Sequence, residues 1–431
     1  MLSAFASAFR TPDLRNKLLF TLGIVSIFRL GSVVPTPGVD YKAIRGCIAL
    51  VQDQSVYGLI NLFSGGALLQ LSVFALGIMP YITASIIIQL LTVVIPRLES
   101  LREEGQAGQA KLTQYTRYLT IGLAVLQSTG IIALARVPGR LFQGCPSQII
   151  PNQSIMTIIT MIMVMTAGTG IIMWLGELIT DRGVGNGMSL LIFTSIIATF
   201  PGQLWQIETI NGLFTLLLVL AVGFAIIAAV VYVEQAQRRI PVQYAKRMVG
   251  RRMYGGTSTY IPLKVNMAGV IPVIFASSLL YLPTLFVQLS GSTGAFAQWI
   301  QQNLTRGTEP LYMIVYFLLI IFFCYFYVAI TFNPVEVADN MKQYGGFIPG
   351  IRAGKPTAEY LDYVLTRITL PGSLYLATIA IIPFIAFASL GVGQRFLFGG
   401  TSLLIMVGVG LDTVKQIESQ LQQRNYEGFL R

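Results

Sequence analysis

Ten apolar segments, each long enough to cross a bilayer as a helix, are the strongest constraint on the fold of this chain. They lie near residues 18–35, 72–95, 118–135, 154–177, 188–207, 211–233, 266–289, 310–332, 371–390 and 396–414. A transmembrane helix needs about 20 apolar residues, and soluble domains contain about 25% charged residues. This chain contains 11%. We therefore expect an all-α polytopic membrane protein with ten transmembrane helices.

Lysine and arginine residues are unevenly distributed between the two sides of such a bundle. With ten spans both termini lie on one side, and that side carries 22 of the 29 Lys and Arg residues. The opposite loops carry 6, and Arg29 falls inside the first span. Because cytoplasmic loops collect positive charge, both termini are predicted to be cytoplasmic. This bias also accounts for most of the net charge of +11, which otherwise suggests a nucleic-acid partner.

The apolar run over residues 62–95 is too long for one span. Its 34 residues would reach about 50 Å at about 1.5 Å per helical residue. Gly65, Gly66, Gly77 and Pro80 interrupt it. The helix could tilt steeply, or its first part could fold back inside the protein as a separate short helix. The residues alone leave both alternatives open.

The composition excludes several kinds of chemistry. The chain has no histidine, which excludes histidine metal sites, histidine acid–base catalysis and a Ser-His-Asp triad. Its three cysteines, Cys47, Cys145 and Cys324, lack the spacing of a zinc or redox motif. Cys47 and Cys145 fall in predicted outer loops and could form a disulfide. No cofactor is expected.

Charged residues inside the spans are few. Arg29 lies in the outer half of the first span, and Glu177, Glu234 and Asp412 lie near cytoplasmic ends. Snorkelling or local pairing explains such positions. An ion-coupled transporter normally has more charges in the middle of its spans.

An isoleucine stripe and a few polar residues distinguish the second and third spans. Ile78, Ile82 and Ile86 recur every four residues and so share one helical face. Taken alone, this stripe is more typical of a packing or lipid-facing surface than of a pore. Thr83 and Gln127 are uncharged polar residues, which commonly form interhelical hydrogen bonds in membranes.

Two predicted cytoplasmic loops, about 234–265 and 333–370, exceed ordinary connections. The first carries clustered basic residues among tyrosines, including Lys246, Arg247, Arg251 and Arg252. This composition suits anionic partners such as RNA or acidic protein faces, and it equally suits anionic lipid. In the second loop, glycines and prolines around Arg352 suggest a shaped turn that presents one cation.

Six stretches together resemble the SecY family of bacterial protein-translocation channel subunits. They are NLFSGGALLQLSVFALGIMPYITASIIIQLLTVVIP, EGQAGQAKLTQYTRYLT, MWLGELITDRGVGNGMSLLIF, STYIPLKVNMAGVIPVIFASS, FNPVEVADNMKQYGGFIPGIRAGKPT and FGGTSLLIMVGVGLDTVKQIES. The resemblance runs in order from about Thr11 to Ser419. It does not extend to the segment between the third and fourth spans or to the outer loop near 286–309.

The resemblance implies two inverted five-helix halves and a plug. The halves would be residues 1–210, with spans one to five, and 211–431, with spans six to ten and both long loops. The plug would be a short re-entrant helix at about 59–71, which favours folding back of the long apolar run. Its residues would include Ser64, Gly65, Gly66 and Leu68.

The resemblance also implies a pore ring and a lateral gate. The ring would close the waist with Ile78, Ile82, Ile192, Ile274 and Ile405, whose apolar side chains can seal around a passing chain without binding it specifically. The gate would lie between spans two and three and spans seven and eight. Thr83, Gln127 and Asn266 would be its polar closers.

The implied function is a passive channel in the plasma membrane for unfolded secretory chains, which also releases transmembrane segments sideways into the lipid. Lys246, Arg247, Arg251, Arg252 and Arg352 would dock the ribosome or the motor ATPase SecA. The chain has no GxxxxGK[ST] motif, so a partner must supply the energy. The small subunits SecE and SecG would complete the complex.

Two other classes of protein share some of these features. A secondary transporter can also have ten spans in inverted halves, but it needs polar groups that converge at the midplane. Aliphatic residues at the presumed waist argue against one. An intramembrane enzyme needs a nucleophile with a base, or a metal, and is the weakest alternative.

Overall fold

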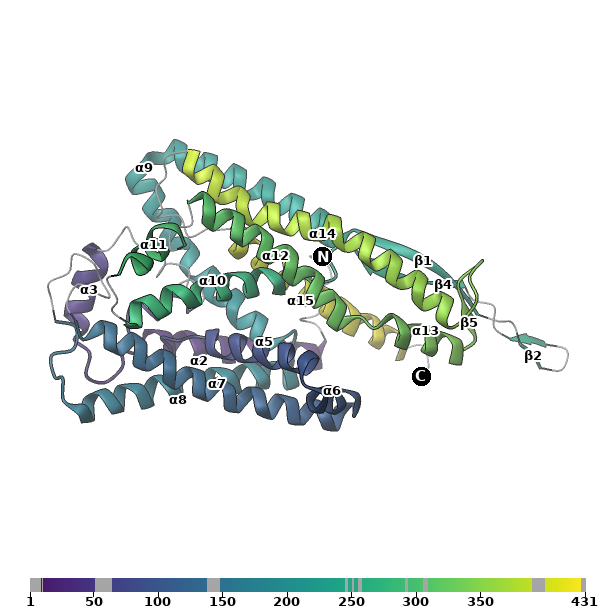
Figure 1. The fold of residues 1–431 in the computed structure, drawn as a ribbon, viewed down its shortest axis with the longest axis horizontal. Helices are drawn as coiled ribbons and strands as arrows, with labels where there is room; N and C mark the ends of the chain where they lie inside the picture. Colours follow the sequence, from purple (N-terminus) through teal and green to yellow (C-terminus); the bar gives the residue numbers. More distant parts are fainter. Residues whose placement is uncertain are drawn as a thin grey trace.

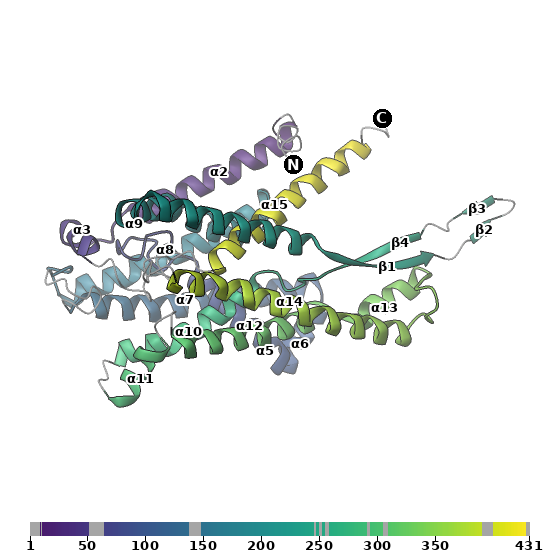
Figure 2. The same cartoon turned by 90° about the horizontal axis from the view of Figure 1, so that it is seen from above.

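The computed structural model describes residues 9, 11–50, 64–137, 148–244, 247–249, 252–254, 258–290, 294–304, 309–389 and 400–427 of the chain. Most of these residues form helices that run roughly along the long axis of the molecule (Figure 1). Helices α3 (Tyr41–Leu50) and α11 (Ala295–Asn303) lie at one end, and strands project from the opposite end (Figures 1 and 2).

Each of the ten predicted spans falls on a helix. The N-terminal spans correspond to α2 (Pro12–Val33), α5 (Met79–Val94), α7 (Gln106–Ala135), α8 (Ile155–Arg182) and the first part of α9 (Gly187–Gln235). The C-terminal spans correspond to the second part of α9, α10 (Ile271–Ser290), α12 (Pro310–Thr331), α14 (Lys355–Ser389) and α15 (Gly400–Glu427). Gly212 has φ 83° and separates the two parts of α9.

Not every span is a long straight helix. Within the described residues, seven helices are long and apolar enough to cross a membrane, or eight when α5 and α6 (Pro96–Glu103), bent by 105°, count as one span. Pro96 at the start of α6 explains the bend, because proline cannot continue the hydrogen bonding of α5. The apolar part of α10 is shorter, Ile271–Leu280.

Side-chain caps set the starts of three helices. Ser154 accepts a hydrogen bond from the amide of Thr157 before α8, and Asn186 accepts two before α9. Asn333 does the same before α13 (Pro334–Gln343), which begins with a proline. Such caps satisfy amides that have no partner inside the helix.

The long apolar run folds back, but not as a helix over the part that the structure describes. Residues 64–71 form consecutive turns instead of the expected plug helix, and turns continue to residue 78, so that α5 begins seven residues after the predicted start of the second span. Gly65, Gly66, Leu71 and Gly77 all have positive φ, which a right-handed helix does not allow. Residues 59–63 of the predicted plug lie outside the described residues.

The two long loops form one β-extension, which the all-α prediction missed. β1 (Gln237–Tyr244) pairs antiparallel with β4 (Ser258–Lys264) in the first loop. β5 (Gly346–Phe347), from the second loop, pairs with the end of β1 and gives the order β4-β1-β5. The short strands β2 (Arg247–Val249) and β3 (Arg252–Tyr254) form a hairpin at the tip (Figure 2). The second loop is also shorter than expected, because α14 begins at Lys355.

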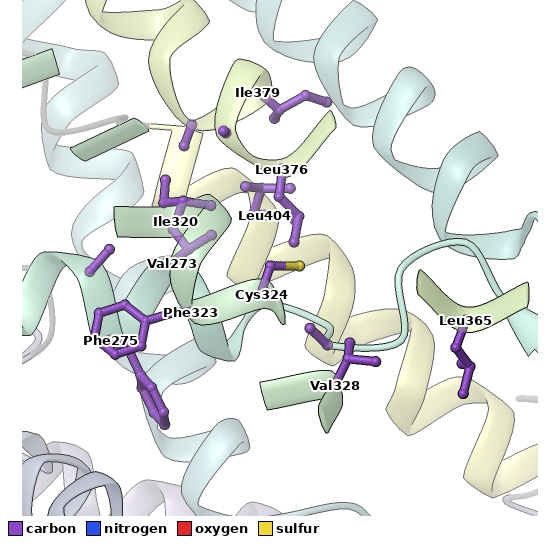
Figure 3. Close-up of a cluster of buried hydrophobic side chains, with 14 of the residues drawn as sticks. Val273, Phe275, Ile320, Phe323, Cys324, Val328, Leu365, Leu376, Ile379 and Leu404 are labelled. Atoms are coloured by element: carbon purple, nitrogen blue, oxygen red, sulfur yellow. The ribbon is translucent and has the colours of Figure 1, made fainter. Parts of the chain in front are cut away.

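The C-terminal helices share the largest apolar core, here called the C-terminal core. Side chains of α10, α12, α14 and α15 meet in it (Figure 3). Ile240, Val242 and Leu263 at the base of the β-extension belong to the same core. Phe275 and Phe323 meet edge to face with ring centroids 5.6 Å apart. The core also buries Cys324 as a free thiol.

Cys47 on α3 is disulfide-bonded. The chain contains only two other cysteines, Cys324, which is free, and Cys145, which lies outside the described residues. Cys47 is fully buried, and a disulfide involving it fits the prediction that it lies in an outer loop.

Candidate functional site

The five isoleucines predicted at the waist meet in one apolar cluster, here called the ring cluster. Ile78, Ile192, Ile274 and Ile405 are buried in it, and Ile82 packs against it as a partly buried neighbour. These residues come from α5 and the turn before it, α9, α10 and α15. The two halves of the chain therefore meet at these side chains.

The turns before α5 place Ile78 at the ring cluster. Gly77 has φ 56°, and Ile78 is the N-cap residue of α5, followed closely by Pro80 in the first turn. Proline is favoured there because the first amides of a helix have no partner inside it. The isoleucine stripe of α5 lies against the interior of the protein. Ile82 packs against both the ring cluster and the C-terminal core, and Ile86 is buried in the C-terminal core. It is a packing surface and does not face lipid.

The ring cluster contains several residues that sequence reasoning missed. Phe28 of α2 stacks on Phe74, with ring centroids 6.0 Å apart. Ile172 and Ile179 of α8 and Val409 of α15 are also buried there. Ile172 and Ile179 are seven residues apart on one face of α8, so helical periodicity could have identified them.

The described plug residues are buried beside α2 and α9. The Ser64 hydroxyl accepts a hydrogen bond from the amide of Leu68 at 3.1 Å. The Gly65 carbonyl accepts one from the Arg29 guanidinium at 3.0 Å. Gly66 is half-buried, and Leu68 has 3% relative exposure. The plug turns are therefore packed inside protein, where irregular backbone is tolerated in a membrane.

A second apolar cluster, here called the plug seat, surrounds the end of the plug turns. Leu68 and Leu71 pack there with residues of α3, α7 and α8, including the disulfide-bonded Cys47. Thr36 donates two hydrogen bonds to the Leu71 carbonyl, from its amide at 3.0 Å and its hydroxyl at 2.7 Å. Leu71 has φ 44°, and these bonds hold it in that unusual conformation.

The three predicted gate residues do not meet through their side chains. Thr83 on α5 donates its hydroxyl hydrogen to the Met79 carbonyl of its own helix. Gln127 is half-buried on α7. Asn266, just before α10, donates its two amide hydrogens to Glu234 at 2.5 Å and to the Gly269 carbonyl at 3.1 Å. The Asn266 side chain is thus engaged within the C-terminal half.

The helices of the predicted gate nevertheless lie side by side. α10 contacts both α5 and α7. Among the described side chains of α10, the buried hydroxyl groups are those of Ser277 and Ser278, and the Ser278 hydroxyl has no hydrogen-bond partner among the described residues. The run ASSLL in the sequence could have identified these two serines as the polar groups of this helix.

A groove of ≈280 Å³ lies between α5, α7 and α12. Polar side chains line much of it, including Tyr81, Ser85, Gln89, Thr92, Thr116 and Tyr327. At its edge, the Arg102 guanidinium of α6 donates a hydrogen bond to the Ile330 carbonyl in the last turn of α12. The last carbonyls of a helix lack intrahelical partners and carry partial negative charge, so a cation is favoured there.

The acidic residues that were predicted to lie near cytoplasmic ends have local partners in the structure. Arg117 of α7 forms a two-pronged ion pair with Glu177 of α8, with both N–O distances at 2.8 Å. The Lys264 Nζ atom lies 3.6 Å from the Asp412 Oδ1 atom, which is an ion pair. Together with Asn266, this pair and Glu234 line a cavity of ≈490 Å³ between α9, α10 and α15. No group of three His, Cys, Asp or Glu residues in the described part of the chain could hold a metal ion.

The predicted docking residues lie in the β-extension and in the turn before α14. Arg247 and Arg252 are on the tip strands β2 and β3, whereas Lys246 and Arg251 fall outside the described residues. Arg352 is exposed, and the buried Thr357 donates its hydroxyl hydrogen to the Arg352 carbonyl at 2.9 Å. Gly350 and Gly354, with φ of 83° and 101°, form the shaped turn around it.

Comparisons with known proteins agree with this arrangement. The SecY family model matches residues 72–414. Protein translocase subunit SecY from Streptomyces scabiei is 68% identical over 438 aligned residues, which cover 100% of both chains.

Two solved structures share the fold. One concerns the plug domain of the SecY protein, described as stabilising the closed state of the translocation channel and maintaining a membrane seal; it has 20% identity and a TM-score of 0.63. The other is Sec61 in the canine ribosome–channel complex from the endoplasmic reticulum, with 17% identity and a TM-score of 0.61. Each match covers 94% of this chain and 91% of the other.

The arrangement does not support the two alternative classes. A solute transporter needs convergent polar groups at the midplane, whereas the ring cluster that joins the halves is built of aliphatic and aromatic side chains. An enzyme needs a nucleophile with a base, and the charged residues described above are instead joined in ion pairs, Arg117 with Glu177 and Lys264 with Asp412.

Proposed function

The chain belongs to the SecY family, and on that premise we propose which of its parts perform each task of a protein-conducting channel. As a SecY subunit it forms the pore of a protein translocase, which passes unfolded polypeptides across a membrane and releases transmembrane segments sideways. The observation that best supports this function is that five isoleucines from the two halves meet in one cluster: Ile78, Ile82, Ile192, Ile274 and Ile405.

The five isoleucines act as the seal of the resting pore. Aliphatic side chains exclude water and ions by packing and dewetting, and they form no directional bonds to a passing chain. This indifference suits a channel whose clients differ in sequence. The halves, residues 1–210 and 211–431, separate at the ring cluster when a chain enters, and Gly212 marks the change from one half to the other.

The plug turns close the pore on its outer side. Ser64, Gly65, Gly66 and Leu68 are held by hydrogen bonds and by the plug seat, so a translocating chain must displace them. The related SecY structure whose plug is described as maintaining a membrane seal supports this role.

The lateral gate opens between α5 and α7 on one side and α10 and α12 on the other. Thr83, Gln127 and Asn266 lie on or next to these helices, and Ser277 and Ser278 supply the hydroxyls of α10. Hydrogen bonds across such an interface contribute about 1 kcal/mol each. A signal helix of about 20 apolar residues can therefore compete with the closed gate.

Partners supply the energy. The ribosome or SecA docks on the β-extension and on the turn at Arg352, through Lys246, Arg247, Arg251, Arg252 and Arg352. The pairing of β5 with β1 supports one joint docking surface, because it ties the two loops together. The structural likeness to a channel described in complex with a ribosome fits this role. SecE and SecG bind the helical bundle from the lipid side.

The charge distribution gives the orientation. Both termini and the β-extension lie in the cytoplasm, because that side carries 22 of the 29 Lys and Arg residues. The membrane is the plasma membrane, and α3 and α11 lie at its outer face. Lipid surrounds the exposed apolar faces of the spans, such as Phe214 and Phe224 of α9.

A photo-crosslinking amino acid at Ile82 tests the pore assignment. An arrested secretory chain, presented with ribosomes or SecA in membranes that contain the complex, should crosslink to this position only when it carries a signal sequence. Ile171 is the matched control, because this isoleucine is exposed on α8 beside the buried Ile172. If Ile171 captured the chain and Ile82 captured only lipid, the pore assignment would be wrong.

A further inference from the structure

Arg29 is the one Lys or Arg residue that falls inside a predicted span, and it lies four residues before the end of α2. Its guanidinium Nη1 lies 3.0 Å from the Gly65 carbonyl oxygen of the plug turns. Arg29 is half-buried, and the preceding residue, Phe28, is buried in the ring cluster. The simple explanation by snorkelling therefore does not hold for this residue.

The plug turn at Gly65 is clamped between two helices. A Cβ atom on Gly65 would lie 2.6 Å from the Arg29 Nη1 atom and 3.2 Å from the Ser195 Cα atom of α9. Ser195 precedes Ile196, another buried member of the ring cluster. Gly65 also has φ 66°, a conformation that favours glycine and that a regular right-handed helix does not contain. The contact thus fits a residue without a side chain, directly beside the ring cluster.

The Arg29 guanidinium has a different hydrogen-bond acceptor in each state of the pore. A guanidinium far from water is costly unless acceptors surround it. While the plug turns are seated, the Gly65 carbonyl is an acceptor for Arg29. When the plug leaves, the carbonyl leaves with it, and water that enters the opened pore hydrates the guanidinium instead.

We propose that Arg29 is the latch of the plug: its bond to the Gly65 carbonyl favours the closed pore, and hydration of its charge favours the open pore once the plug has moved. This inference rests on the plug assignment made above. Arg29 is a positioning residue, since it acts on the plug turns and needs no contact with the client chain. A charged donor makes a stronger hydrogen bond than a neutral one, which explains why a charge is found at this depth.

The first test is the ion leak of the resting channel in planar bilayers. Arg29→Met keeps most of the side-chain length and removes every donor, and we expect it to raise the leak by about tenfold, the effect of losing one charge-assisted bond. Arg29→Lys should restore most of the seal, because lysine keeps the charge. Ser26→Ala on the exposed face of the same helix is the control and should leave the leak unchanged. A wild-type leak in Arg29→Met would overturn the proposal.

A second variant approaches the latch from the plug side. Gly65→Ala leaves Arg29 intact but places a methyl group 2.6 Å from its guanidinium, so we expect a similar leak. The double variant should leak no more than either single variant, because both remove the same bond. Additive leaks would show that the two residues act separately and would contradict the latch.

A fixed plug distinguishes this latch from a general weakening of the ring cluster. Leu68 and Met161 are buried together in the plug seat, and a Leu68→Cys, Met161→Cys pair joined by a crosslinker should abolish the extra leak of Arg29→Met. If the ion leak of Arg29→Met persisted with the plug crosslinked, Arg29 would act on a part of the pore other than the plug. Crosslinking of the arrested chain at Ile82 is measured in parallel on the wild type. If that succeeds while Arg29→Met remains tight, the latch alone is wrong.

Discussion

The ring cluster and the β-extension are held together in opposite ways. The ring cluster joins side chains from α2, α5 and the turns before it, α8, α9, α10 and α15, and apolar packing is its main cohesive force. The β-extension is a backbone ladder between neighbouring strands, with residue pairs such as Ile240 and Ile261 in register. Its arginines Arg238 and Arg239 are exposed.

This difference matches the two kinds of contact proposed above, a seal around a client chain at the ring cluster and a docking surface on the β-extension. A seal must part around any client chain and close again, so it is built from apolar contacts that have no preferred orientation. A docking surface must present charges in fixed positions, so it is built on a rigid backbone. Side-chain changes should therefore have large effects on leak at the ring cluster, and effects on transport at selected charges of the docking surface.

The largest effect is expected at the ring cluster itself. Ile82→Gly together with Ile274→Gly removes side chains from both halves, and we expect the resting leak to rise about tenfold or more, because dewetting needs bulk. Conductance recordings on purified complex in planar bilayers measure this. Ile171→Gly on the exposed face of α8 is the control. No added leak in the double variant would mean that these residues do not form the seal.

The next largest effect is expected at the docking surface. Arg352→Glu should lower SecA-dependent transport about tenfold while assembly and resting leak stay normal, because the reversed charge repels an acidic partner. Lys355→Glu, three residues later at the start of α14, reverses the same charge and is the matched control. An acidic residue is favourable at a helix start. Equal loss of transport in both variants would show that local net charge matters and that the turn at Arg352 does not.

The ring cluster could largely be predicted from the sequence, and the β-extension could not. Apolar segments of about 20 residues specify membrane helices directly, and resemblance to the SecY family singled out the five isoleucines that meet. β5 was missed because its partner, β1, lies about 100 residues earlier in the chain. A two-residue strand gives no periodic signal of its own.

The backbone of the plug and the hydrogen bonds of Asn266 could not be predicted, for local reasons. Three positive φ angles, at Gly65, Gly66 and Leu71, turn the plug segment away from a helix, and from the sequence only the glycines among these positions were visible. Asn266 was assigned to the gate from the family resemblance and from its polarity. Its neighbour in space, Glu234, precedes it by 32 residues and occupies its amide group.

A smaller effect is expected where the gate meets the cytoplasmic side. Arg102→Gln removes the charged donor to the Ile330 carbonyl between α6 and α12, so the gate should open more easily. We expect a gain of about two- to fivefold in transport of a client with a weakened signal sequence, since an exposed charged bond is worth about 1 kcal/mol or less. Arg97→Gln, also on α6, is the control. Unchanged or reduced transport of the weak client would exclude a closing role for Arg102.

The smallest effect is expected for a side-chain contact on the surface of the β-extension. The Arg239 guanidinium carbon lies 4.8 Å from the centre of the Tyr260 ring, and both residues are exposed. Such a contact contributes about 0.5–1 kcal/mol. Arg239→Gln should therefore lower the hydrogen-exchange protection of the β1–β4 amides about two- to fivefold and leave transport unchanged.

Val242→Ala is the comparison that decides what holds the extension together. Val242 has 1% relative exposure and packs into the C-terminal core, so its truncation should lower the same protection more than Arg239→Gln does. A larger loss of protection in Val242→Ala would mean that the β1–β4 backbone pairing and its buried base keep the β-extension rigid. Arg239 would then contribute little to that rigidity. Arg239→Gln could instead reduce transport as much as Arg352→Glu does. In that case the partner would respond to the total charge of the β-extension, and the position of each charge would not matter.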